Sequence, residues 1–125
     1  MELIDLTSRG WALRYLREAR AELSLAKDEP ALSLMFSLEA ARKAQACIYH
    51  CLGSAQALEM LVMDAIIEHR APSDRVIGLL MATERLIQAI SETDDPAEAY
   101  RLASSAVKLA ARVVQRVLGR GKGER

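Results

Sequence analysis

The chain has 125 residues, of which 51% are hydrophobic and 4% aromatic, and its 17 basic residues balance its 17 acidic ones. This length predicts one domain with a single core that folds without disulfide or metal. Charge balance is atypical of free-standing nucleic-acid binders, and no apolar run is long enough to span a bilayer. An aliphatic core with few rings favours packed helices, and the polar start MELIDLTSRG does not look like a signal peptide, so we expect an all-α cytoplasmic protein. Asn is absent and Arg outnumbers Lys thirteen to four, which fits a thermophilic source or a GC-rich genome.

The first predicted helix covers residues 8–27. Its apolar side chains recur every three or four positions, which places them on one helical face. Trp11 and Tyr15 on that face are expected to anchor either the core or a dimer surface. Asp28 and Pro30 then interrupt the pattern, and Asp28 can cap the following helix with Pro30 in its first turn.

The second predicted helix covers residues 29–52. It is apolar over so much of its circumference that we expect it at the centre of the molecule. Gly53 is suited to end it, although a bent helix that continues through Gly53 also fits the pattern.

Two further helices are predicted over residues 55–69 and 73–90, each with apolar side chains at helical spacing. The clearest helix start follows at Asp95, which can cap, with Pro96 in the first position and Glu98 able to reach back to the Asp95 amide.

The helix that starts there is expected to end near residue 118, before a charged flexible tail over residues 119–125. No segment alternates like a strand. The prediction is therefore one domain over residues 1–118, an up-and-down bundle of four to five helices.

The segment CIYHC, residues 47–51, holds both cysteines and one of the two histidines. On a helix Cys47, His50 and Cys51 are neighbours, so three soft ligands could approach one zinc ion. Further ligands would have to come from the next predicted helix, which offers Asp64, Glu68 and His69. Zinc ligands usually come from more than one element, so we interpret both thiols as reduced, small, buried core residues and predict no metal. A cysteine nucleophile here would also lack a nearby loop that could form an oxyanion hole.

Residues 21–53, AELSLAKDEPALSLMFSLEAARKAQACIYHCLG, resemble the first two helices of the HEPN superfamily. Within them SLEAARKAQACIYHCLG is similar to the family's second helix, which often reads A-x-x-A-A-E-K-A-hydrophobic before a Gly. The segment AEAYRLASSAVKLAARVVQRVLG resembles the family's last helix. The resemblance covers most of the chain, is one of composition, and implies an up-and-down helical core that often forms a homodimer.

Many HEPN proteins are ribonucleases whose Arg-x(4–6)-His motif is completed across the dimer. Others lack the motif and bind partners, notably small nucleotidyltransferases in toxin–antitoxin pairs. Here the nearest match is Arg42, with seven residues between it and His50. We therefore expect a non-enzymatic, HEPN-like homodimer without a cofactor, acting with a partner such as a nucleotidyltransferase.

Two alternatives remain open. One is a metal-independent ribonuclease, in which His50 transfers a proton and Arg42 stabilises the developing phosphate charge. The other is nucleotide binding between helices by basic side chains, for which the candidates are Arg42, Lys43, Arg70 and Arg75.

Overall fold

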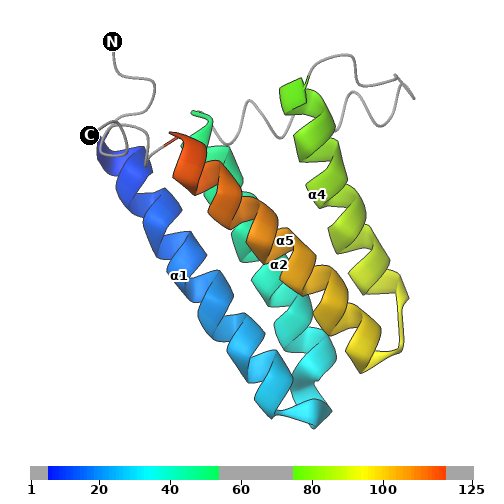
Figure 1. The fold of residues 1–125 in the computed structure, drawn as a ribbon. Coiled ribbons are helices and arrows are strands. Elements are labelled where there is room, and N and C mark those ends of the chain that lie inside the picture. Colours follow the sequence, from blue (N-terminus) through cyan, green and yellow to red (C-terminus); the bar gives the residue numbers. More distant parts are fainter. Residues whose placement is uncertain (1–5, 54–74, 118–125) are drawn as a thin grey trace.

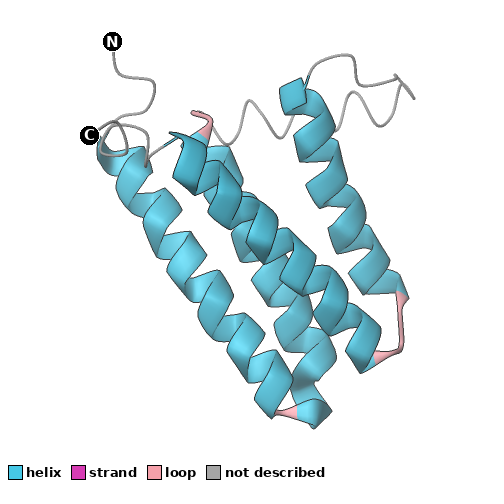
Figure 2. Ribbon diagram, in the orientation of Figure 1, coloured by secondary structure: helices cyan, strands magenta, loops and turns pink. Residues whose placement is uncertain are grey.

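The computed structural model describes residues 6–53 and 75–117. Regular structure in these ranges is entirely helical (Figure 2) and comprises α1 (Leu6–Asp28), the single-turn 3-10 helix η1 (Pro30–Leu32), α2 (Ser33–Cys51), α4 (Arg75–Glu92) and α5 (Pro96–Val117). The helices run up and down, and α1 and α4 lie on opposite sides of the α2–α5 pair (Figure 1). The predicted all-α, up-and-down bundle is confirmed. The predicted helix over residues 55–69 and the tail over residues 119–125 lie outside the described residues.

None of the described helices combines the length and the apolar character that a membrane crossing requires.

The connection between α1 and α2 differs from the prediction. Asp28 is the last residue of α1 and caps nothing, while Glu29 precedes η1 without a capping side-chain bond. The chain reverses on backbone hydrogen bonds instead, with the Glu29 N–H donating to the Leu25 carbonyl at 2.9 Å and the Leu32 N–H to the Glu29 carbonyl at 3.0 Å. Because Pro30 opens a tight 3-10 turn, α2 begins at Ser33, a few residues later than the spacing predicts.

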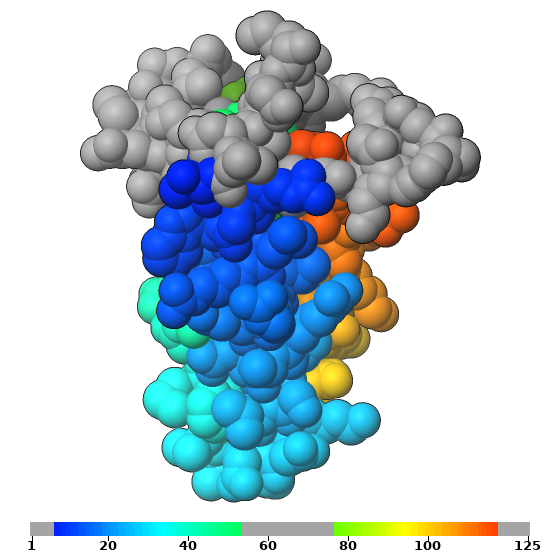
Figure 3. All heavy atoms as spheres, turned by 90° about the vertical axis from the view of Figure 1, so that its left-hand side faces the viewer, coloured from blue at the N-terminus to red at the C-terminus, as the bar shows by residue number. Residues whose placement is uncertain are grey.

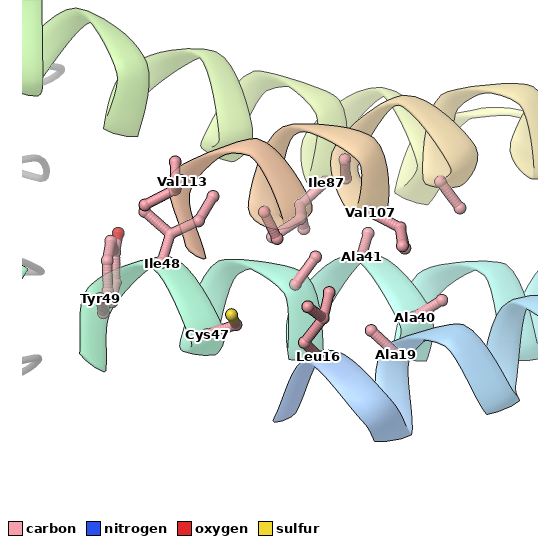
Figure 4. Packing of buried hydrophobic residues seen from close by; sticks show 14 of the residues in the cluster. Leu16, Ala19, Ala40, Ala41, Cys47, Ile48, Tyr49, Ile87, Val107 and Val113 are labelled. Atoms are coloured by element: carbon pink, nitrogen blue, oxygen red, sulfur yellow. The ribbon is translucent and has the colours of Figure 1, made fainter. Parts of the chain in front are cut away.

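Helix α2 is central, as predicted, and small side chains follow one of its faces at alternating steps of four and three: Ser33, Ser37, Ala40, Ala44, Cys47 and Cys51. Helix α1 meets α2 with a similar face, on which buried alanines recur at every seventh position: Ala12, Ala19 and Ala26. Figure 4 shows Leu16 and Ala19 of α1 beside Ala40 and Cys47 of α2. We call this contact the small-residue seam, because short side chains on both sides let the two helix backbones approach closely.

The end of α2 is set by Gly53. The Leu52 N–H is shared between the carbonyls of Ile48 and Tyr49 at 3.1 Å each, which tightens the last turn. Gly53 then adopts a φ of +119°, which side chains other than hydrogen rarely tolerate. The helix therefore stops here, and the alternative of a bent helix through Gly53 is wrong.

Helix α5 begins as predicted at Asp95, whose carboxylate accepts a hydrogen bond from the Ala97 N–H at 3.0 Å. Glu98, however, does not reach the Asp95 amide. The Asp95 N–H donates to the Thr93 hydroxyl at 3.1 Å, and that hydroxyl donates to the Glu98 carboxylate at 2.8 Å. Thr93 thus relays the contact that was expected to be direct, because its hydroxyl lies between the two groups.

Helix α4 packs with larger side chains than α1 does. Its buried apolar residues are Leu80, Met81, Ile87 and Ile90. The buried Thr83 hydroxyl donates to the Leu80 carbonyl at 2.8 Å, so it brings no unpaired polar group into the core. A hydrogen bond of 2.8 Å from the Gln45 amide to the Glu84 carboxylate ties α4 to α2.

Candidate functional site

The CIYHC segment forms the last turns of α2. Cys47 is 0% exposed and Cys51 2%, and both are free thiols in the small-residue seam. Their positions continue the serines and alanines that occupy the same face of α2 earlier in the chain. The interpretation of the thiols as small core residues is confirmed.

The acidity of Cys47 agrees with this packing role. The hydrogen-bonding contact with the Cys51 thiol and burial both raise the pKa of Cys47. Cys47 therefore stays protonated near neutral pH, whereas a metal ligand or a nucleophile must be a thiolate.

His50 does not join the thiols in a ligand set. It is half-buried on α2, and its ring stacks on Tyr15 with centroids 5.5 Å apart and on Trp11 with centroids 6.3 Å apart. Within the described ranges, no three His, Cys, Asp or Glu side chains come together in a way that could hold a metal ion. The metal candidates Cys47, His50 and Cys51 are thus not brought together around one point. Asp64, Glu68 and His69 lie outside those ranges.

The rings of Trp11, Tyr15 and His50 meet in a triangle across the α1–α2 pair, in which each ring lies beside the other two; we call this cluster the stack. The Trp11 and Tyr15 centroids are 5.8 Å apart, and the three rings are inclined to one another by 19° to 31°. The Arg14 guanidinium lies 5.2 Å from the centre of the Trp11 ring, within the range of a cation–π contact. Trp11 is still 41% exposed, so the stack ends in an accessible indole.

The spacing of Trp11 and Tyr15, one turn apart, was the sequence signal for part of this stack. The place of His50 in it depends on the register of two antiparallel helices. That register is a tertiary property, which residue spacing does not give.

An ion-pair network continues from the stack along the same side. The Glu18 carboxylate contacts Arg14 at 2.8 Å and Lys43 at 3.2 Å, and Lys43 also contacts Glu22 at 3.0 Å. Hydrogen bonds from Arg14 and Lys43 lower the pKa of Glu18, and the bond to Glu22 raises the pKa of Lys43. The two contacts of Lys43 join α2 to α1 on this side.

The remaining predicted site residues do not converge. Arg42 is exposed on α2, two helical turns before His50 and therefore about 12 Å away along the axis, so the two side chains do not meet within one chain. Lys43, a nucleotide candidate, is instead neutralised by Glu18 and Glu22. Arg75 is the first residue of α4, and Arg70 lies outside the described ranges.

Exposed large apolar side chains are concentrated on the first part of the described chain. Among the described residues, six large hydrophobic side chains are at least 37% exposed, and all belong to α1, η1 or α2: Trp11, Leu13, Leu25, Leu32, Leu34 and Met35. In the view of Figure 3, α1 runs down the middle of the molecule with α2 along one edge and α5 along the other.

Comparison with known proteins gives no relative: no family model, no curated protein and no solved structure matches the chain.

Proposed function

We propose that the chain is a cytoplasmic, HEPN-like helical interaction module that forms a homodimer through α1 and α2 and has no catalytic activity of its own. The observation that carries the proposal is that Trp11 and Leu25, two of the large apolar side chains exposed in the described ranges, lie on one face of α1. Contiguous exposed apolar surface marks interaction sites on soluble proteins.

One side of the α1–α2 pair combines these groups in a suitable order. Trp11, Tyr15 and His50 lie at one end, and the ion pairs of Glu18 and Lys43 lie in the middle. Leu25 follows Trp11 by two heptads and is rotated from it by only about 40°, at a distance of about 21 Å along α1. Met35, 52% exposed, belongs to the first turn of α2, at the same end of the α1–α2 pair as Leu25. We call this surface the hairpin face.

The hairpin face is suited to a second copy of itself. Two copies related by a two-fold axis through the ion pairs would place the Trp11 end of one against the Leu25 and Met35 end of the other. Each apolar end would then be covered by the opposite end. Trp, Tyr and Arg are also the residue types that contribute most to binding at interface centres.

The identity of the partner is proposed from the family resemblance. HEPN proteins that lack the Arg-x(4–6)-His motif bind partners, notably small nucleotidyltransferases, and that partner is proposed here too. The spacing of Arg42 and His50, with seven intervening residues in place of four to six, supports this branch over the ribonuclease alternative. Titration with a small nucleotidyltransferase from the same source should give a complex at micromolar concentration. If no complex forms, the proposed partner is wrong, and the proposed dimer is unaffected.

The dimer is tested by native mass spectrometry and sedimentation equilibrium. The wild-type chain should be a dimer at micromolar concentration, and Trp11→Ser should weaken it by at least about tenfold, because an interface aromatic contributes on the order of 2 kcal/mol. Leu13→Ser is the matched control, since it removes an exposed apolar group on the same helix but about 200° away from Trp11.

A monomeric wild-type chain would remove the proposal. A dimer that Trp11→Ser leaves unchanged while Leu13→Ser dissociates it would place the interface on another face.

A further inference from the structure

A second surface feature lies between α4 and α5. An open groove with a volume of about 290 Å³ is lined by Leu79 of α4 and by Leu109 and Val113 of α5, with Arg112 and Arg116 completing the lining. The three aliphatic side chains provide an apolar floor. The two arginines are exposed and stand one turn apart on α5, so both guanidinium groups can reach a group placed over that floor.

The positive charge of this groove has no neutralising partner among the described residues. Neither Arg112 nor Arg116 makes a hydrogen bond or an ion pair within residues 6–53 and 75–117. Lys108, one turn before Arg112, is exposed as well. The acidic side chain of α5 is Glu98, in its first turn, where it already contacts Thr93 and Arg101. In a chain with no net charge, this part of α5 is locally cationic.

We propose that the α4–α5 groove binds a small amphiphilic anion, an organic molecule with a phosphate or carboxylate head and an apolar body. Arg112 and Arg116 would hold the head, because a guanidinium donates two parallel hydrogen bonds to either group. Leu79, Leu109 and Val113 would cover the body. The volume is near the lower end of the range for small-molecule sites, so a body of a few carbons to about ten fits best.

The apolar floor of the groove favours an amphiphilic anion over a polyanion such as nucleic acid. Nucleic acid would use the exposed cations of α5 without needing Leu79 or Leu109, and its binding would weaken steeply with salt. The groove also shares no residue with the hairpin face. Ligand binding in the groove therefore does not depend on the proposed dimer.

The test is an NMR titration of the ¹⁵N-labelled full-length chain, followed at backbone amides and arginine side chains. The ligands are octyl phosphate, octanoate, inorganic phosphate, octyl glucoside and a short oligouridylate, the amphiphiles all below micelle formation. We expect saturable shifts at α4 and α5 with one or both amphiphilic anions, and whichever binds more tightly identifies the head group. Inorganic phosphate should bind at least about tenfold more weakly, because it leaves the floor uncovered.

Two variants and a control complete the design. Arg112→Gln and Arg116→Gln should each weaken anion binding about tenfold, the usual effect of losing one charged hydrogen-bond partner. Arg101→Gln, at the other end of α5, should leave it unchanged. Leu79→Ser should also weaken binding, with circular dichroism to confirm that the variant is folded.

The proposal is overturned if octyl glucoside binds as tightly as octyl phosphate, or if Arg101→Gln lowers affinity as much as Arg112→Gln. It is equally overturned if the oligouridylate alone shifts these resonances, or if no ligand does.

Discussion

The two outer helices, α1 and α4, pack on the same α2–α5 pair in opposite ways. Helix α1 buries mainly alanines against the small side chains of α2, and a ring stack and ion pairs hold its outer edge. Helix α4 buries Leu80, Met81, Ile87 and Ile90 and has the hydrogen bond between Gln45 and Glu84 as its tie to α2. The position of α1 is thus determined by close fit, and that of α4 by apolar area. Added side-chain volume should disturb the contact between α1 and α2, and removed side-chain volume should disturb the packing of α4.

The largest effect is expected from removing volume under α4. Leu80 is 0% exposed, and Leu80→Ala should lower the free energy of unfolding by about 2–5 kcal/mol, through lost burial and the cavity that remains. Urea denaturation followed by circular dichroism measures this change. The control is Leu13→Ala on α1, whose side chain is 37% exposed and whose truncation should change stability much less.

Adding volume to the small-residue seam should have the next largest effect. Ala19 is 0% exposed, and Ala19→Leu should lower the free energy of unfolding by about 1–3 kcal/mol, because the extra carbons force α1 and α2 apart. Ala21→Leu makes the same change at an exposed position of α1 and should be nearly neutral. Equal losses in the two variants would show that the seam is not closely packed.

A smaller gain is expected at Ser37. This residue is 0% exposed, and its hydroxyl is the buried side-chain oxygen without a hydrogen-bond partner in the described ranges. Ser37→Ala should raise the free energy of unfolding by about 1 kcal/mol, because the desolvated hydroxyl is removed. Ser24→Ala, at an exposed position of α1, corrects for the helix propensity gained in both variants, about 0.5 kcal/mol. A loss of stability in Ser37→Ala would mean that the hydroxyl has a bonding partner.

The smallest effect concerns the ion pairs at the edge of α1. Arg14 and Lys43 lower the pKa of Glu18, so the ionised carboxylate stabilises the fold above its unfolded-state pKa, and this contribution is lost as the pH falls through the folded-state value. The urea midpoint of the wild type should therefore exceed that of Glu18→Gln at pH 7. The difference should close below about pH 4.3, the ordinary value for glutamate.

Glu29→Gln removes an exposed carboxylate that forms no ion pair within the described part of the chain. Its midpoint should follow that of the wild type at both pH values. A Glu18→Gln difference that does not change as the pH falls would show that it does not come from the charge of Glu18.

The sequence predicts those features that depend on neighbours along the chain. The course of α1 and the cap at Asp95 follow from local spacing or from one residue's conformational preference, whereas the end of α2 at Gly53 is one of two interpretations that the pattern allows. The prediction fails where a third group intervenes. Thr93 takes the hydrogen bonds expected between Glu98 and the Asp95 amide, and a 3-10 turn replaces the start of α2.

In the candidate sites, too, the sequence predicts what depends on neighbours along the chain and misses what depends on contacts between helices. The sequence correctly assigned the thiols of CIYHC to the core, and the structure adds that Cys47 and Cys51 continue a face of serines and alanines. The stack of His50 on Trp11 and Tyr15 and the neutralisation of Lys43 by Glu18 and Glu22 depend on how α1 registers against α2. The α4–α5 groove likewise joins residues from two helices, and no local pattern relates Leu79 to Arg112.

The most direct test of the small-residue seam is the rate at which an aromatic disulfide reagent modifies Cys47 and Cys51. Both thiols are closed off in the native chain, so each should react far more slowly than in urea, at a rate set by opening of the fold. Destabilising the chain with Ala19→Leu should accelerate the reaction. If either thiol of the native wild type reacts as fast as in urea, CIYHC is an accessible, chemically competent segment and not part of the core.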